Sequence, residues 1–139
     1  PLSSPPDTDA PPCVLVADEN AVSRSMLDAA FGACGVAVDM AADGAETVRL
    51  ALGHRRYTAV LLTLTLHIVN SHDAARMIKS TRNLNTATPI VALVLHDADD
   101  DINVSGSVFD TFMTLPPSIV RVRALLGWIR EYAAAGALL

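Results

Sequence analysis

Two adjacent acidic residues, Asp18 and Glu19, directly follow the apolar stretch CVLVA at positions 13 to 17. A second apolar stretch, LLTLTLH at positions 61 to 67, carries two threonine hydroxyls and ends in His67. Carboxylates are ligands for Mg²⁺ and Ca²⁺, carboxylates with imidazole suit transition metals, and an activated hydroxyl is a nucleophile. The candidate chemistry is therefore cation binding or covalent transfer, provided that the fold brings these residues together.

Short apolar strands alternate with helical patterns along the chain. Strands are predicted at residues 13–17, 36–40, 58–64, 89–95 and 109–115. Helices are predicted between Asn20 and Gly35, between Asp43 and Gly53, over about 71–82, and from Ser118 onward. The segment 96–108 has four aspartates and few apolar residues, which predicts a short or mobile fourth helix.

Helical periodicity predicts which side chains face the core. The inward residues of the first, second and last helices should be Val22, Met26, Ala30 and Ala33; Ala45, Val48 and Leu52; and Val122, Leu125, Ile129 and Tyr132.

Five strand–helix units with strands too apolar to face water predict an α/β fold, in which helices cover both faces of a doubly wound parallel sheet. A length of 139 residues fits one domain. Residues 1–12, PLSSPPDTDAPP, are predicted to be a proline-rich linker, residues 13–133 the folded domain and residues 134–139 a C-terminal tail. The linker and the first residue, which is Pro, suggest a piece of a longer protein.

The carboxyl ends of the strands are where ligands bind in open parallel sheets. The positions to inspect are therefore Asp18 and Glu19, residues 63–67, residues 94–96, and Leu115 with Pro116.

In this setting the sequence resembles the receiver domain of two-component response regulators over residues 13–133. The stretches that carry the resemblance are VLVADEN, YTAVLLTLTLH, TPIVALVLH and FMTLPP. The resemblance implies a flavodoxin-like (βα)5 fold with strand order 2-1-3-4-5. The stretches ARMIKSTRNLNTATPIVAL and GSVFD are similar, more narrowly, to the receiver at the C-terminal end of fungal nutrient-signalling protein kinases of the AGC type.

The chain departs from the family at three positions that carry its chemistry. The phosphoacceptor aspartate falls on Thr63, and the hydroxyl that contacts the phosphoryl group falls on Val94. The lysine that precedes the proline and neutralises the phosphoryl charge falls on Leu115. Lys79, the single lysine, belongs to the third helix and cannot substitute. A threonine without an activating base is a poor nucleophile. We therefore expect a degenerate receiver, a pseudo-receiver, in which the strand LLTLTLH is structural.

No metal or cofactor is predicted. The alternative is residual Mg²⁺ or Ca²⁺ binding by Asp18 and Glu19 with a backbone carbonyl near Thr65, but two carboxylates offer few of the oxygens that these ions need. We expect solvated acids instead, one of them helping to cap the first helix. His67 and His96 at the same edge allow a transition-metal cluster with these acids, although no HxxxH or CxxC spacing supports it.

The resemblance also implies structural details at the fifth strand. Phe112 falls on the family's switch aromatic, and without a hydroxyl at Val94 we expect it to hold one packed orientation. Leu115–Pro116 matches a cis peptide of the family. Receivers signal through the surface around the fourth and fifth helices, so the predicted interface comprises Phe112, Arg121, Arg123, Trp128 and Arg130. Trp128 either anchors a partner there or packs on the sheet.

The predicted function is a phosphorylation-independent protein-interaction or regulatory module, not an enzyme, whose partner is another protein or a linked kinase. A net charge of −5 without a basic run argues against nucleic acid, no apolar run is long enough for a membrane span, and two cysteines fit a reducing compartment, cytoplasmic or nuclear. We expect a monomer or a weak homodimer.

The alternative is an atypical receiver that binds a divalent cation or accepts a phosphoryl group at Thr63 or within residues 97–101. An enzyme or nucleotide binder would need a phosphate cradle, and neither GxGxxG nor GxxxxGK[ST] occurs.

Overall fold

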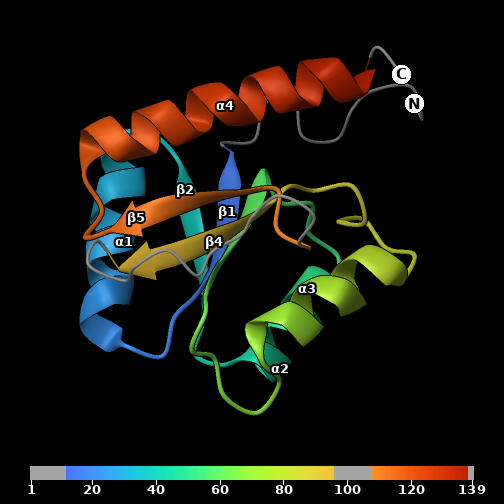
Figure 1. Ribbon diagram of the computed structural model, residues 1–139. Coiled ribbons are helices and arrows are strands. Elements are labelled where there is room, and N and C mark those ends of the chain that lie inside the picture. Colours follow the sequence, from blue (N-terminus) through green and yellow to red (C-terminus); the bar gives the residue numbers. More distant parts are fainter. Residues whose placement is uncertain (1–11, 96–107, 138–139) are drawn as a thin grey trace.

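The computed structural model describes residues 12–95 and 108–137 (Figure 1). Five strands and four helices lie within them: β1 (Cys13–Ala17), α1 (Ala21–Ala33), β2 (Ala37–Ala41), α2 (Gly44–Ala51), β3 (Ala59–Thr63), α3 (Ser71–Ser80), β4 (Ile90–Leu95), β5 (Thr111–Leu115) and α4 (Ile119–Ala137). The predicted fourth helix, at 96–108, lies outside the described residues except for its last position.

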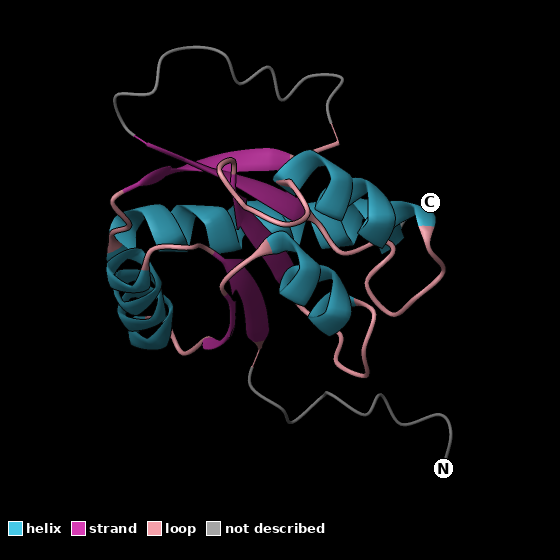
Figure 2. Ribbon diagram, turned by 90° about the horizontal axis from the view of Figure 1, so that it is seen from below, coloured by secondary structure: helices cyan, strands magenta, loops and turns pink. Residues whose placement is uncertain are grey.

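The strands form one parallel sheet in the order β2-β1-β3-β4-β5. This order confirms the predicted doubly wound fold. Helices α1 and α4 pack on one face, while α2 and α3 pack on the other (Figures 1 and 2). Every strand therefore ends at the same edge of the sheet, called the carboxyl edge below.

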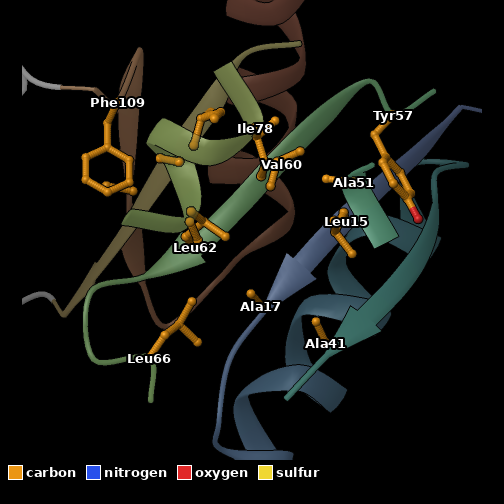
Figure 3. Close-up of a cluster of buried hydrophobic side chains, with 14 of the residues drawn as sticks. Leu15, Ala17, Ala41, Ala51, Tyr57, Val60, Leu62, Leu66, Ile78 and Phe109 are labelled. Carbon is orange, nitrogen blue, oxygen red and sulfur yellow. The ribbon is translucent and has the colours of Figure 1, made fainter. Parts of the chain in front are cut away.

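The core has two layers because side chains alternate between the faces of each strand. Leu15 and Leu62 point toward α2 and α3 with Ile78 and Phe109 (Figure 3). Val14 and Leu61 point toward α1 and α4 with Phe31. Because both faces are covered, the central strands are apolar throughout, as the sequence indicated.

The predicted helix starts are confirmed at two positions. Asn20 Oδ1 accepts hydrogen bonds from the backbone N–H groups of Val22 and Ser23, and Asp43 Oδ1 accepts one from Glu46. Gly35, directly after the C-cap of α1, has φ +77°, a left-handed conformation that glycine adopts without a Cβ penalty.

The predicted inward face of α1 is confirmed at Ala30 and wrong at the other three positions. Val22 and Met26 are 68% and 41% exposed, and Ala33 is exposed as well. With Ala30, the helix buries Leu27 and Phe31. The large Phe31 and Leu27 side chains remove more apolar surface from water than the predicted set, and this difference decides the rotation of the helix.

The predicted inward face of α2 is confirmed at Val48, which is partly buried against the core. The fully buried residues are Gly44, Thr47 and Ala51, whereas Leu52 is the exposed C-cap residue. Small residues allow the helix to approach its neighbours closely, and the Thr47 hydroxyl donates to the Asp43 carbonyl at 2.7 Å, so its burial leaves no unsatisfied donor.

Helix α4 buries Val122, Leu125 and Ile129 as predicted, but Tyr132 is 37% exposed. The helix continues to Ala137, through four of the residues that the sequence assigned to a tail after residue 133. No helix in the described segments is both long and apolar enough to cross a membrane.

Candidate functional site

Asp18 lies in the turn between β1 and α1, at the carboxyl edge. Its backbone N–H donates to the Ala41 carbonyl at 3.1 Å, and its Oδ1 accepts from the Asn20 N–H at 2.9 Å. The residue is only 5% exposed, and its Oδ2 has no hydrogen-bond partner among the described residues. The expectation of a solvated acid is therefore wrong for Asp18. The cap of α1 is Asn20, because the Asn20 side chain reaches the first free N–H groups of the helix.

Glu19 contacts a residue from another loop. Its Oε2 pairs with Nδ1 of His67, in the loop between β3 and α3, and the two side chains are 28% and 78% exposed. The His67 carbonyl accepts from the N–H groups of Gly44 at 3.2 Å and of Val69 at 2.8 Å, so the backbone holds His67 in place. Sequence reasoning placed both residues at this edge but did not pair them.

Close approach of two backbones seats this loop. A Cβ on Gly44 would lie 1.7 Å from the Val69 carbonyl oxygen, so only glycine fits at the first position of α2. Ile68 has φ +69°, an uncommon conformation for a β-branched residue, and its side chain is 79% exposed. The loop that carries His67 is thus defined by tertiary contact.

The ends of β3, β4 and β5 carry three buried side chains without charge. Thr63, Val94 and Leu115 are 7%, 6% and 6% exposed. The Thr63 hydroxyl donates to the Ala17 carbonyl at 3.3 Å, so its proton is already engaged. The predicted cis peptide at Leu115–Pro116 is confirmed.

Lys79 lies far from these residues in the fold. Its Nζ donates to Asp110 Oδ2 at 2.9 Å, and Asp110 also accepts from the N–H of Ile90, the first residue of β4. Ile90 begins β4 and Asp110 directly precedes β5, so this contact lies at the amino ends of the two strands. Lys79 therefore lies at the edge opposite to Asp18, as the sequence indicated.

The donors at the carboxyl edge do not fit a divalent cation as they stand. Asp18 offers one free oxygen, Glu19 is engaged by His67, and the Thr63 hydroxyl is a donor to backbone. Magnesium needs about six oxygen ligands in near-octahedral geometry. Within the described parts of the chain, no group of three or more His, Cys, Asp or Glu residues is arranged to hold a metal ion. His96, the other histidine of the transition-metal alternative, lies outside the described residues.

A shallow groove of about 270 Å³ lies between β5 and α4. It is lined by Thr111, Phe112, Met113, Thr114, Arg121, Ala124, Leu125 and Trp128. Three of the five predicted interface residues thus share one surface, while Arg123 and Arg130 are exposed elsewhere on α4. Trp128 is half-buried, packs against the core and stacks on Tyr132 with ring centroids 4.9 Å apart.

Phe112 does not have the packed position expected for it. It is 52% exposed, because β5 is an edge strand and strand alternation turns its neighbours Met113 and Leu115, not Phe112, into the core. Arg121, beside it, donates to the Pro116 carbonyl at 2.6 Å.

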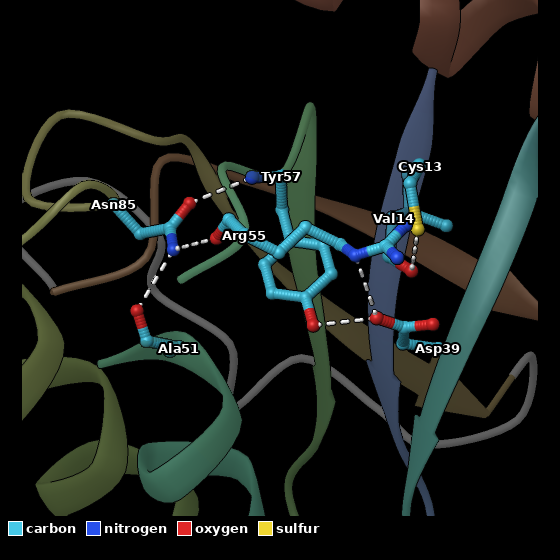
Figure 4. Close-up of polar contacts among 7 residues, drawn as sticks. All are labelled: Cys13, Val14, Asp39, Ala51, Arg55, Tyr57 and Asn85. Carbon is cyan, nitrogen blue, oxygen red and sulfur yellow. Dashed lines mark hydrogen bonds and ion pairs between the residues drawn. The ribbon is translucent and has the colours of Figure 1, made fainter. Parts of the chain in front are cut away.

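A polar cluster at the amino ends of β1 and β3 escaped sequence reasoning (Figure 4). The Tyr57 hydroxyl donates to Asp39 Oδ2 at 2.7 Å, and Arg55 lies 3.5 Å from the same oxygen. Burial, with the nearby Asp39 carboxylate, raises the pKa of Tyr57 well above its usual value, and burial also raises the pKa of the Cys13 thiol. No motif signals these contacts, since they join three separate segments.

Asn85 is the buried centre of the neighbouring loops. It is 0% exposed; its Oδ1 accepts from the Tyr57 N–H at 2.8 Å, and its Nδ2 donates to the carbonyls of Ala51 and Arg55 at 2.8 and 2.9 Å (Figure 4). Its role is structural, because both side-chain atoms are fully engaged.

No protein-family model matches the chain. The autoinducer 1 sensor kinase/phosphatase LuxN of Vibrio campbellii and that of Vibrio harveyi are each 25% identical over 127 residues, which is 91% of this chain. The chain spans only 14% of the length of those kinases.

Solved receiver domains share the fold. The receiver domain of the sensor histidine kinase PA1611 from Pseudomonas aeruginosa PAO1, solved with a magnesium ion in its active-site cleft, is 25% identical with a TM-score of 0.73, covering 86% of this chain and 98% of that one. The chemotaxis response regulator CheY4 of Vibrio cholerae is 17% identical with a TM-score of 0.74, covering 86% and 99%.

The strand order and these solved structures define a CheY-like, flavodoxin-type α/β fold. More particularly, at 25% identity the chain is similar to the receiver domain of a sensor histidine kinase and to the LuxN sensor kinases.

Proposed function

We propose that this domain is a pseudo-receiver, which does not carry a phosphoryl group and regulates a protein partner or a linked kinase through direct contact. The observation that carries the proposal is the composition of the carboxyl edge, where β3 and β5 end in Thr63 and Leu115 and β4 has Val94 next to its last residue. These positions offer no carboxylate to attack phosphorus and no ammonium to balance the added charge.

The joint absence of the carboxylate and the ammonium indicates a site that is stable without phosphorylation. A buried lysine without a partner carboxylate would be strongly destabilising, whereas a neutral Thr63, Val94 and Leu115 set can be buried without any partner charge. The Thr63 hydroxyl supports the same conclusion. It donates its proton to the Ala17 carbonyl, and a backbone carbonyl is too weak a base to activate it as a nucleophile.

The alternative is an atypical receiver that still binds a cation or accepts a phosphoryl group. One observation favours it: the buried Asp18 Oδ2 has no partner within the described residues. Treatment with acetyl phosphate and Mg²⁺, followed by intact-mass spectrometry, separates the two. The pseudo-receiver keeps its mass, whereas a gain of one phosphoryl group that disappears in Thr63→Ala would establish the alternative with Thr63 as acceptor.

The groove between β5 and α4 is the surface that we propose for the partner. It combines the half-exposed Phe112 with Arg121 and Trp128, and aromatic and arginine side chains dominate interface energetics. The narrower resemblance to receivers of fungal AGC-type kinases and the 25% identity to LuxN both support a linked kinase as the regulated partner.

Kinase activity of the parent protein tests this surface. Phe112→Ser should change that activity several-fold in either direction, because removal of an anchor costs roughly 1–3 kcal/mol of contact energy. Val22→Ser is the matched control, since Val22 is an apolar residue on α1 that is 68% exposed, against 52% for Phe112. Equal activity of both variants and the unaltered protein would remove the groove from the proposal.

A further inference from the structure

The Glu19–His67 pair joins the two loops that flank the carboxyl edge. Glu19 follows β1, His67 follows β3, and these strands are neighbours in the sheet. The Nδ1 atom of a neutral histidine can donate to a carboxylate, and a protonated ring adds a positive charge. Glu19 therefore has an internal partner at the edge where a cation would have to reach it.

Asp18 shows that the same edge needs positive charge. One of its oxygens lies buried without a partner among the described residues, and an ionised oxygen in that position is costly unless a cation lies near. Arg24 is also tied to this turn, since its Nη1 donates to the Asp18 backbone carbonyl at 2.6 Å. Two nitrogen-donor side chains of the chain itself, Arg24 and His67, thus lie around the two adjacent acids.

We propose that His67 takes the place of a divalent cation at this edge: by holding Glu19, it withdraws one carboxylate from metal coordination and ties the two loops together. This inference rests on the proposed function and deepens it. It names His67 as a second cause of weak divalent-cation binding, beside the absence of a carboxylate at Thr63.

Competition follows from the contact. Magnesium coordinates carboxylate oxygens directly or through ordered water, and the His67 ring contacts one of the two Glu19 oxygens, Oε2. An ion that takes Oε2 has to displace the imidazole, and an ion that uses Oε1 alone has one oxygen fewer, so the pair lowers the affinity for the ion. Restoring a carboxylate at Thr63 should therefore be insufficient for tight binding while His67 is present.

Magnesium chloride titrations followed by amide NMR shifts at residues 17–20 and 63–66 test the competition. Three chains are compared: Thr63→Asp, Thr63→Asp with His67→Ala, and Thr63→Asp with His54→Ala. The His67 double variant should bind Mg²⁺ about 2- to 5-fold more tightly than Thr63→Asp alone, the range expected for the loss of a largely exposed ion pair. The His54 double variant should match Thr63→Asp, because His54 is exposed at the opposite end of β3. Affinities within twofold across all three overturn the role of His67.

A second measurement covers the case in which Thr63→Asp does not fold. Manganese broadening of the amides at residues 17–20 is then compared between the unaltered chain and His67→Ala. Half-maximal broadening should need at least about twofold less Mn²⁺ in the variant, and equal concentrations overturn the inference. Failure of the proposed function has a different signature, because it requires saturable Mg²⁺ shifts in the unaltered chain that grow with beryllofluoride.

Discussion

Lys79 donates a hydrogen bond to Asp110 at 2.9 Å, and this contact fixes the single lysine of the chain at the amino ends of β4 and β5. Asp110 also accepts from the backbone N–H of Ile90 at 2.8 Å and from the Tyr132 hydroxyl at 3.2 Å. One carboxylate thus connects α3, β4 and α4. The lysine is part of the scaffold and is absent from the edge where a receiver needs a cation.

Asp110→Ala is expected to lower the free energy of unfolding by about 2–3 kcal/mol, because it leaves the Ile90 N–H and the partly buried Lys79 ammonium without their acceptor. Urea denaturation followed by circular dichroism measures the change. Asp73→Ala is the control: its pair with Arg76 is exposed, so removal should cost less than about 1 kcal/mol, apart from a small effect on the start of α3. Equal losses would show that Asp110 contributes no more than a surface ion pair.

Asn85→Ala should be among the more damaging single polar substitutions. The side chain is fully buried, and its loss leaves the Tyr57 N–H and two carbonyl groups unpaired, with an expected cost of roughly 3 kcal/mol. Chemical denaturation gives the value, and hydrogen exchange of the Tyr57 amide reports the lost bond directly. Arg82→Ala, an exposed change in the same loop, should be nearly neutral. An unchanged Tyr57 exchange rate would contradict the structural role.

Two glycines give opposite expectations for the same substitution. Gly44→Ala places a Cβ 1.7 Å from the Val69 carbonyl oxygen and should destabilise the domain by roughly 2–4 kcal/mol. Gly127→Ala, in α4, meets nothing within 4 Å and should stabilise it by about 0.5–1 kcal/mol through helix propensity. Thermal unfolding of both variants decides, and a neutral Gly44→Ala would mean that the His67 loop is not seated as described.

Stability should depend on the ionisation of Tyr57 at high pH. Burial and the bond to Asp39 raise its pKa above the unfolded value of about 10, so the fold favours the protonated hydroxyl. The resulting stability is fully present below pH ~10 and is lost as pH rises further, by up to about 1.4 kcal/mol per pH unit. In a Tyr132→Phe background, where Tyr57 is the single tyrosine, ultraviolet difference absorbance should show tyrosinate only above the ordinary range.

The matched comparison for this pH dependence is Tyr57→Phe in the same background. Cys13 is present in both chains, so its own raised pKa cancels from the difference. The stability gap between the two variants should narrow above pH ~10. A gap that stays constant to higher pH would show that the Tyr57 hydroxyl is not held in its protonated form.

The elements of the fold were predictable because each rests on local signals. Alternation and apolar runs gave the strands, and Asn20 and Asp43 gave helix starts that the structure confirms. Which face of each helix is buried was less predictable. Val22 and Met26 have suitable spacing, yet Phe31 and Leu27 are the buried side chains of α1, because the choice depends on the shape of the sheet against which the helix packs.

The sequence by itself was enough to predict the strand order, the residues at each strand end and the cis peptide at Leu115–Pro116. The residues at the strand ends are read directly from the sequence, whereas the strand order and the cis peptide were implied by its resemblance to receiver domains. Only the tertiary structure decided that Asp18 is buried with a free oxygen, that Phe112 is exposed, and that Glu19 meets His67. Such contacts join segments that are distant in sequence, so their energies depend on the packing of whole elements and leave no periodic signal in the chain.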